Sequence, residues 1–197
     1  MNSMKKVILI SAGDPASIST EITIKAIESS KINKNIKPIV VSNSKLIESC
    51  KKVIRSNIQL NEIEDKVNFS DFKENHLNII TLKIPDNIIL GEQNIKYASF
   101  VKNSIITCVK TQMESIASAI VTNPINKKMM YRSGFKFQGH TDFLASLSKN
   151  KKNPVMMLVS SELKTIPLTI HVPLKNVPKL ISKDLIEITI NIAKESL

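Results

Sequence analysis

Several residue types are scarce in this chain of 197 residues, and each scarcity excludes a class of protein. Tryptophan is absent and aromatic residues make up only 4% of the chain, so isoleucine, leucine and valine must form most of the core. Cys50 and Cys108 are the only cysteines and lie far apart in the sequence, which argues against a disulfide framework and a cysteine metal site. This cysteine usage predicts a cytoplasmic protein.

Long apolar runs and glycine-rich nucleotide motifs are also missing. No run reaches the roughly 18 apolar residues that span a bilayer, so no membrane association is expected. The apolar run at residues 7–10 is too short for a secretory signal and leads into Gly13 and Pro15, so we interpret it as a first strand. Neither a Gly-x-Gly-x-x-Gly pattern nor a P-loop occurs, which leaves a Rossmann or Walker site without support.

The net charge of +11 raises the possibility of a nucleic-acid partner, but its pattern argues against one. The charge comes almost entirely from lysines spread along the chain, and arginine occurs only at Arg55 and Arg132. Aromatic residues do not alternate with the basic ones, as stacking platforms for bases would. We therefore expect no nucleic-acid partner.

The order of the predicted elements indicates an α/β fold. A hydrophobic content of 42% is enough for a real core, and the length suits one domain, or one domain and part of another. Apolar runs of strand length occur at residues 7–11, 38–41, 77–82, 117–122, 154–159 and 165–171. Helical periodicity covers residues 19–32, 43–53, 95–113 and 142–147, with a further start near residue 125. Residues 57–75 are ambiguous, and residues 183–197 alternate like a strand but suit a helix better by length.

The segment from Gly134 to Lys149 holds two of the four glycines and one of the three histidines. A glycine followed by His-Thr-Asp and an apolar run predicts a tight turn into a helix, with Thr141 or Asp142 as its cap. His140 would then stand at the helix mouth, where a small anionic substrate can approach. The alternative is a loop whose histidine is incidental.

Three further groups of polar residues follow predicted strands. Ligands of open α/β sheets gather at the carboxyl ends of strands. Asp14 follows the first strand, in a turn that Gly13 and Pro15 explain equally well. Residues 122–127 combine a hydroxyl, amides such as that of Asn123 and the Lys127 ammonium, which suits a phosphate or carboxylate but also a plain turn. His171 ends a predicted strand, where it suits a metal ion or a purely structural role.

Four segments together resemble one family. Residues 12–16, 122–127, 134–145 and 169–174 occur in the order and spacing of the 4-hydroxythreonine-4-phosphate dehydrogenase (PdxA) family, and the resemblance covers essentially the whole chain. It implies the three-layer fold of the isocitrate and isopropylmalate dehydrogenase group, with two α/β lobes and a cleft between them. It also implies a homodimer that shares its active sites.

The resemblance further implies an activity and its site residues. The family oxidises and decarboxylates 4-phosphooxy-L-threonine with NAD to 3-amino-2-oxopropyl phosphate, in pyridoxal phosphate (vitamin B6) biosynthesis. His140 and Thr141 would contact this small phosphorylated substrate, and Asp14, Asn123 and Lys127 would lie in its cleft. His171 would be one of three histidine ligands to a divalent metal ion such as zinc, magnesium or cobalt.

The chain departs from the family pattern in two ways. Where the family has Gly-Ile-Gly-Pro-Glu, this chain has Ser-Ile-Ser-Thr-Glu at residues 17–21, a bulkier loop for a close backbone approach. Family members are much longer, so we expect residues 1–197 to be the N-terminal portion of the two-lobed enzyme, without the C-terminal portion that supplies the other metal histidines. His76 matches no ligand position. A chain with one of about three ligands is expected to be inactive alone.

Two other functions stay open at this point. One keeps the fold and changes the substrate to another four-carbon acid phosphate. The other is a non-catalytic remnant that binds a phosphorylated ligand.

Overall fold

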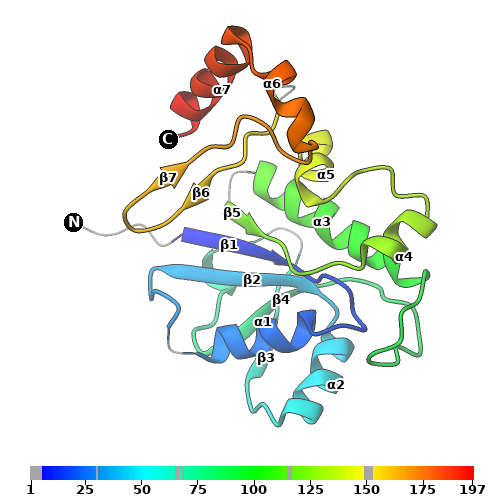
Figure 1. The fold of residues 1–197 in the computed structure, drawn as a ribbon. Helices are drawn as coiled ribbons and strands as arrows, with labels where there is room; N and C mark the ends of the chain where they lie inside the picture. The colour runs from blue at the N-terminus through cyan, green and yellow to red at the C-terminus, as the bar shows by residue number, and fades with distance from the viewer. Residues whose placement is uncertain (1–5, 30, 65–66, 68, 115–116, 149–152) are drawn as a thin grey trace. The chain divides into compact units, whose positions relative to one another are not determined.

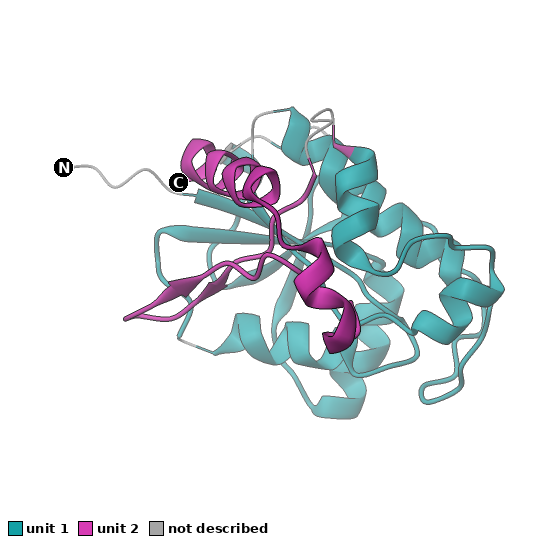
Figure 2. Ribbon diagram, turned by 45° about the horizontal axis from the view of Figure 1, so that its top comes forward, with its two compact units in different colours: residues 1–147 teal, residues 148–197 magenta. Residues whose placement is uncertain are grey.

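The computed structural model describes residues 6–29, 31–64, 67, 69–114, 117–148 and 153–197. The chain divides into two compact units, Met1–Leu147 and Ser148–Leu197, which Figure 2 distinguishes by colour. None of the described helices is long and apolar enough to cross a membrane.

The first unit is built on a parallel sheet of five strands. Their spatial order is β3 (Gln59–Glu62), β4 (His76–Thr81), β2 (Ile36–Ser42), β1 (Lys6–Ser11) and β5 (Ala117–Val121), as Figure 1 shows. Ile10 of β1 pairs with Val40 on one side and with Val121 on the other. The carboxyl ends of β1 and β5 therefore lie side by side, as the parallel arrangement predicts.

Helices cover both faces of this sheet. On one face, Ile24 of α1 (Ser19–Glu28) and Ile47 of α2 (Ser44–Ile54) pack on Val40, Leu77 and Ile79. The other face is covered by α3 (Tyr97–Met113). Its Cys108 packs on strand residues whose side chains point to that face, namely Val7, Leu9, Ile39, Val41 and Ile80. The predicted three-layer α/β fold with an aliphatic core is confirmed.

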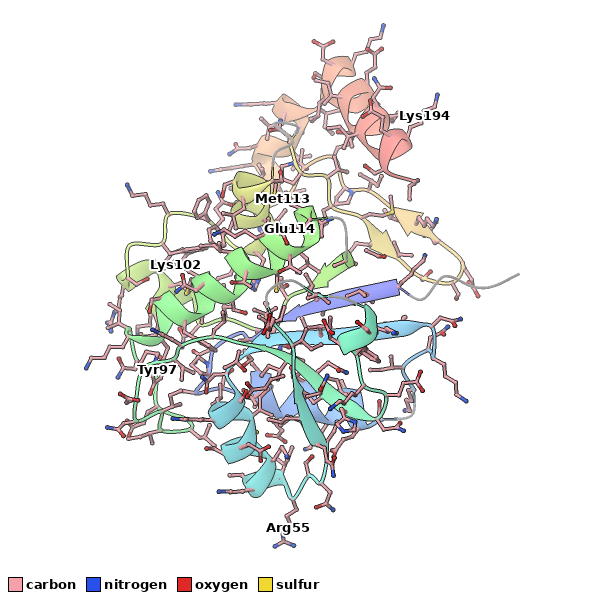
Figure 3. The ribbon with its side chains drawn as sticks, turned by 180° about the vertical axis from the view of Figure 1, so that it is seen from behind. Arg55, Tyr97, Lys102, Met113, Glu114 and Lys194 are labelled. Carbon is pink, nitrogen blue, oxygen red and sulfur yellow. The ribbon has the colours of Figure 1, made fainter. Side chains whose placement is uncertain are left out.

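The ends of two helices are clearly defined. Asn43 begins α2, because its side-chain oxygen accepts a hydrogen bond from the Leu46 N–H at 3.1 Å. Arg55 ends α2 with a left-handed φ of 57°, and its side chain projects away from the protein in Figure 3. The same view marks Tyr97 and Met113, the ends of α3.

The segment at residues 57–75, which the sequence left ambiguous, contains a strand and a short helix. β3 has the polar sequence Gln-Leu-Asn-Glu, and the 3-10 helix η1 spans Phe69–Asp71. Asn61 of β3 is buried and donates to Asn78 Oδ1 at 2.8 Å and to the Asp71 carbonyl at 2.6 Å. These partners allow a polar strand to join the sheet.

The second unit corrects two strand predictions. The strands expected at residues 154–159 and 165–171 shrink to β6 (Leu158–Val159) and β7 (Lys164–Thr165), an antiparallel pair. Pro154 and Pro167 lie in the predicted strands, and proline has no N–H to donate to a ladder. His171 consequently does not end a strand.

The end of the chain is helical, as its length predicted. After η2 (Leu174–Asn176) and α6 (Val177–Leu180), α7 spans Lys183–Ser196 and is capped by Ser182, whose hydroxyl accepts from the Leu185 N–H at 3.1 Å. Its less exposed positions include Leu185, Thr189 and Ile192, which follow the helical period despite the alternating isoleucines.

Candidate functional site

The loops that follow β1 and β5 are locked together at the carboxyl edge of the sheet. The Asp14 N–H donates to the Pro124 carbonyl at 3.0 Å, and the Ser19 hydroxyl donates to the same carbonyl at 2.9 Å. Gly13 has a left-handed φ of 69°, and a Cβ there would lie 2.6 Å from the Pro124 oxygen. Only glycine fits so close an approach.

Asp14 organises its own turn. Its Oδ1 accepts a hydrogen bond from the Ala16 N–H at 3.0 Å, and its carbonyl accepts from the Ser17 N–H at 3.1 Å. The side chain is buried, with the residue 7% exposed. The carboxylate thus shapes the loop next to the predicted cleft, in agreement with the turn interpretation.

Asn123 joins three elements. Its side-chain amide donates to the Ser11 carbonyl at 2.8 Å and to the Thr23 hydroxyl at 2.6 Å, linking the end of β5 to β1 and α1. It is also 7% exposed. Asn123 therefore holds the framework of the loops, a role that the sequence did not separate from ligand contact.

Lys127 brings the loop after β5 to the Gly139-His140 segment. It is the first residue of α4 (Lys127–Arg132), which Asn126 caps by accepting from the Met129 N–H at 3.2 Å. The Lys127 side chain is exposed, and its Nζ lies 3.8 Å from the position that a Cβ on Gly139 would take. Two motifs separated in the sequence thus meet in space.

His140 begins the helix α5 (His140–Leu147), which corrects the predicted start at Asp142. The Gly139 carbonyl accepts from the Phe143 N–H at 3.2 Å, so the first helical bond starts at Gly139. Neither Thr141 nor Asp142 caps the helix, because both lie in its first turn. The Asp142 carboxylate instead accepts from the Gln138 N–H at 3.2 Å, and Thr141 is exposed.

The imidazole of His140 is partly enclosed. Its Nε2 is buried and has no hydrogen-bond partner among the residues that the structure describes. Burial, and after it the positive charge of Lys127, lower the pKa of His140 from its ordinary value. The ring is therefore neutral near pH 7 and offers one donor and one acceptor nitrogen.

Three phenylalanines anchor this segment, a feature that sequence reasoning missed. The rings of Phe135, Phe137 and Phe143 lie 5.1–5.2 Å apart and pack with Val101 and Ile105 of α3. The sequence does contain a sign of this cluster, since half of the six phenylalanines occur within residues 134–145. This cluster fixes the turn that presents His140.

His171 belongs to the second unit and is exposed, with a left-handed φ of 58°. Within the described part of the chain, no group of three His, Cys, Asp or Glu side chains is arranged to hold a metal ion. These residues alone do not fit a complete metal centre. His76 lies at the start of β4, with its Nδ1 2.8 Å from the Glu74 carbonyl oxygen.

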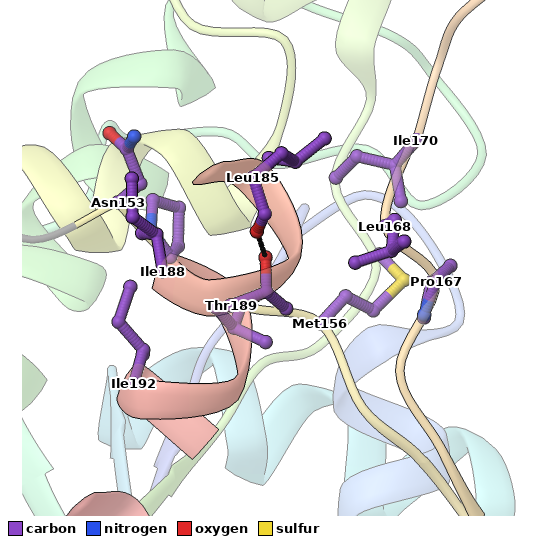
Figure 4. Close-up of a pocket in the computed structure, with 11 residues that line it drawn as sticks. Asn153, Met156, Pro167, Leu168, Ile170, Leu185, Ile188, Thr189 and Ile192 are labelled. Carbon is purple, nitrogen blue, oxygen red and sulfur yellow. Dashed lines mark hydrogen bonds between the residues drawn. The ribbon is translucent and has the colours of Figure 1, made fainter. Parts of the chain in front are cut away.

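A small cavity of about 100 Å³ lies within the second unit. Leu185, Ile188 and Ile192 of α7 line it together with Met156 and Leu168 (Figure 4). The Thr189 hydroxyl at this wall donates to the Leu185 carbonyl at 2.7 Å. Such an apolar lining does not suit a phosphorylated ligand.

Solved structures agree with the fold. A 4-hydroxythreonine-4-phosphate dehydrogenase from Burkholderia phymatum superimposes with a TM-score of 0.83 and 25% identity, over 94% of this chain and 56% of the other. The enzyme of that name from Klebsiella pneumoniae gives a TM-score of 0.83 and 25% identity, over 99% of this chain and 59% of the other. The chain thus spans somewhat more than half of each solved structure.

Sequence comparison points the same way. A 4-hydroxythreonine-4-phosphate dehydrogenase from Methylorubrum extorquens (strain PA1) is 40% identical over 111 residues, which are 54% of this chain and 32% of the relative. The enzyme of that name from Wigglesworthia glossinidia brevipalpis is 38% identical over 114 residues, 58% of this chain and 34% of the relative.

The family model described as "Pyridoxal phosphate biosynthetic protein PdxA" matches residues 34–197. This match contains Asn123, Lys127, His140, Thr141 and His171, while Asp14 precedes it. The match covers most of the chain. The chain therefore belongs to the PdxA family.

Proposed function

We propose that the chain forms part of an NAD-dependent dehydrogenase that oxidises and decarboxylates 4-phosphooxy-L-threonine to 3-amino-2-oxopropyl phosphate in pyridoxal phosphate biosynthesis. The observation that carries the proposal is the meeting of Lys127 with the Gly139-His140-Thr141 turn in a chain of this family. The relatives named above are called dehydrogenases of this phosphorylated substrate.

The proposed role of each residue follows from its surroundings. His140 and Thr141 contact the substrate, as a neutral imidazole and an exposed hydroxyl at the start of α5. Lys127 lines the same cleft with an exposed ammonium. Asp14 and Asn123 serve the site by fixing the loops at its edge, since their side chains bond to the backbone or to buried hydroxyls.

NAD and a divalent metal ion (zinc, magnesium or cobalt) belong to the proposal through the family. His171 is one candidate metal ligand, and among the described residues no group of three ligating side chains includes it. The proposal also includes a homodimer and a cytoplasmic location.

A ligand-binding function without turnover is the second candidate, favoured by the incomplete set of metal ligands in the described part of the chain. On either candidate we expect the purified chain to reduce no NAD with 4-phosphooxy-L-threonine and added zinc, magnesium or cobalt. Absorbance of NADH measures this. Metal-dependent NAD reduction by the chain alone would contradict the ligand count.

Calorimetry tests the proposed substrate directly. We expect the chain to bind 4-phosphooxy-L-threonine more tightly than erythronate 4-phosphate, and His140→Gln to weaken that binding about tenfold, the usual cost of losing a hydrogen bond to a charged group. Lys128→Met, which changes an exposed side chain on the neighbouring helix, serves as the control. Equal affinity for both phosphates would favour the other four-carbon substrate class, and no binding of either would contradict the proposal.

A further inference from the structure

The alternating isoleucines of α7 divide between two faces of the helix. Leu185, Ile188 and Ile192 line the cavity of the second unit, as Figure 4 shows. Ile186 and Ile190 lie on a different face, one turn apart, because residues four positions apart lie above one another on a helix. Neither of them lines the cavity. An alternation typical of a strand thus gives this helix a second apolar face.

The second face has the spacing by which helices pair. It consists of Ile186, Ile190, Ala193 and Leu197, which we call the outer stripe. These residues are separated by four, three and four positions, so their side chains follow one line along the helix. Leu197 directly follows the last residue of α7 and completes the series. This pattern is typical of a helix that packs lengthwise on another helix.

The outer stripe is open in the described part of the chain. Ile190 is 57% exposed and Leu197 is 76% exposed, while Ile186 and Ala193 are partly exposed. None of the hydrophobic clusters of the described residues includes a residue of the stripe. A helix that is apolar on more than one face is normally buried on those faces. Burial of the outer stripe therefore requires a partner.

The charges beside the stripe fit a second copy of the same helix. Glu187 and Lys194 are exposed, and each follows a stripe residue by one position, so both lie on the same flank. In an antiparallel pair of identical helices these flanks meet, and Glu187 of each copy faces Lys194 of the other. In a parallel pair they would face Ser182 and Thr189, which carry no charge. The exposed contact of Glu187 with Lys183, at 3.6 Å within the helix, is too loose to compete strongly.

We propose that the outer stripe of α7 is a docking surface for α7 of a second copy of this chain, arranged antiparallel about a twofold axis. Ile190 of each copy packs beside Ala193 of the other, and Ile186 packs beside Leu197. The inference rests on the proposed function only for the expectation of a homodimer, whereas the surface and its orientation rest on α7 itself. A helix of 14 residues is about 21 Å long, so the dimer is expected to be weak and concentration-dependent.

Analytical ultracentrifugation of the 197-residue chain, from low micromolar to several hundred micromolar concentrations, tests the surface. The chain is expected to pass from monomer to dimer. Ile190→Glu places an unpaired charge in the contact and is expected to weaken the dimer more than about tenfold. Asn191→Glu adds the same charge to an exposed position outside the stripe, and as the matched control it changes the affinity less than twofold. Circular dichroism verifies that both variants fold.

Exchange of the two flanking charges tests the orientation. Glu187→Lys places two lysines opposite each other and is expected to weaken the dimer about fivefold, the effect of losing two exposed ion pairs. Lys194→Glu is expected to do the same with two carboxylates. The double variant restores opposite charges and recovers the affinity, which a purely structural effect on α7 would not do. A further loss in the double variant would overturn the antiparallel arrangement.

The remaining outcomes separate this inference from the proposed function. A chain that stays monomeric at all these concentrations would overturn the inference. A dimer that Ile190→Glu leaves intact would also overturn it, because the contact would then lie elsewhere, and the proposed homodimer would stand. Calorimetry with 4-phosphooxy-L-threonine tests the substrate separately, so a failure of the proposed function there leaves the dimer measurement unaffected.

Discussion

At the scale of single residues, the four glycines are constrained to very different degrees. Gly13 needs a left-handed φ and also space, because a Cβ would lie within 3 Å of Pro124, Ser19 and Asn123 atoms. Gly134 has a left-handed φ of 83° but no atom within 4 Å of its Cβ position. The two positions therefore separate backbone strain from close packing.

This difference predicts unequal losses of stability. Gly134→Ala is expected to lower the free energy of unfolding by about 1 kcal/mol, the cost of left-handed backbone for a residue with a Cβ. Gly13→Ala adds a clash with the Pro124 carbonyl and with Asn123, and is expected to cost more than about 3 kcal/mol. Urea unfolding followed by circular dichroism measures both. Equal losses would show that Gly13 does not approach Pro124 and Asn123 as closely as these distances indicate.

At the scale of elements, asparagine side chains begin two helices of the first unit in different surroundings. Asn43 accepts from the Leu46 N–H and also donates from its amide to the Leu82 carbonyl at 2.6 Å, within a buried site. Asn126 caps α4 through the Met129 N–H. Asn43 thus joins α2 to the chain that follows β4, whereas the described bond of Asn126 is local.

We expect Asn43→Ala to lower the free energy of unfolding by about 2 to 3 kcal/mol, since it removes a cap and leaves the partly buried Leu82 carbonyl without its donor. Asn126→Ala is expected to cost only about 1 kcal/mol, the usual value for a lost cap. Thermal unfolding of the two variants provides the comparison. A larger loss for Asn126→Ala would contradict the roles assigned here.

At the scale of the whole molecule, the two units differ in how much they bury. The first has aliphatic clusters on both faces of its sheet. In the second, Thr189 is the one buried residue among those described, and Leu158, Val159 and Leu174 are more than 60% exposed. Burial of apolar surface is the main stabilising contribution in folding, so the second unit is expected to be the less stable one.

Hydrogen exchange measured by mass spectrometry checks this difference. Amides of α7 are expected to exchange much faster than those of β1 and β2, because regions with few buried apolar contacts open locally at low free energy. The comparison is made within one sample, so unequal protein concentrations do not affect it. Equal protection of α7 and the central strands would contradict the expectation.

Some features were predictable because they depend on local pattern. Apolar runs located the central strands, and the 3.6-residue period located α2 and α3. β3 was not found, because its Asn61 is satisfied by Asn78 and Asp71, which are distant in sequence. The strand predicted at residues 165–171 was too long. Its apolar residues suggested a strand, but Pro167 has no N–H to donate to a neighbouring strand.

The candidate site shows the same division. The Gly-His-Thr turn and the Asn-Pro-Ile-Asn-Lys segment were recognisable as chemistry-bearing from residue types alone. Their contact through Gly139 and Lys127 was not, since it depends on how α4 and α5 pack with α3. Residue type also did not reveal that the Asn123 side-chain amide donates its hydrogen bonds to the Ser11 carbonyl and the Thr23 hydroxyl.

The sequence by itself determined the α/β class, the aliphatic core and the family to which the chain belongs, because hydrophobic period and short motifs are local properties of the chain. Only the tertiary structure decided which polar residues are framework and which are available to a ligand. That distinction depends on burial and hydrogen-bond partners brought together from distant positions: Asp14 and Asn123 are enclosed and bonded, whereas Lys127 and Thr141 stay exposed beside His140. Long-range packing creates these differences.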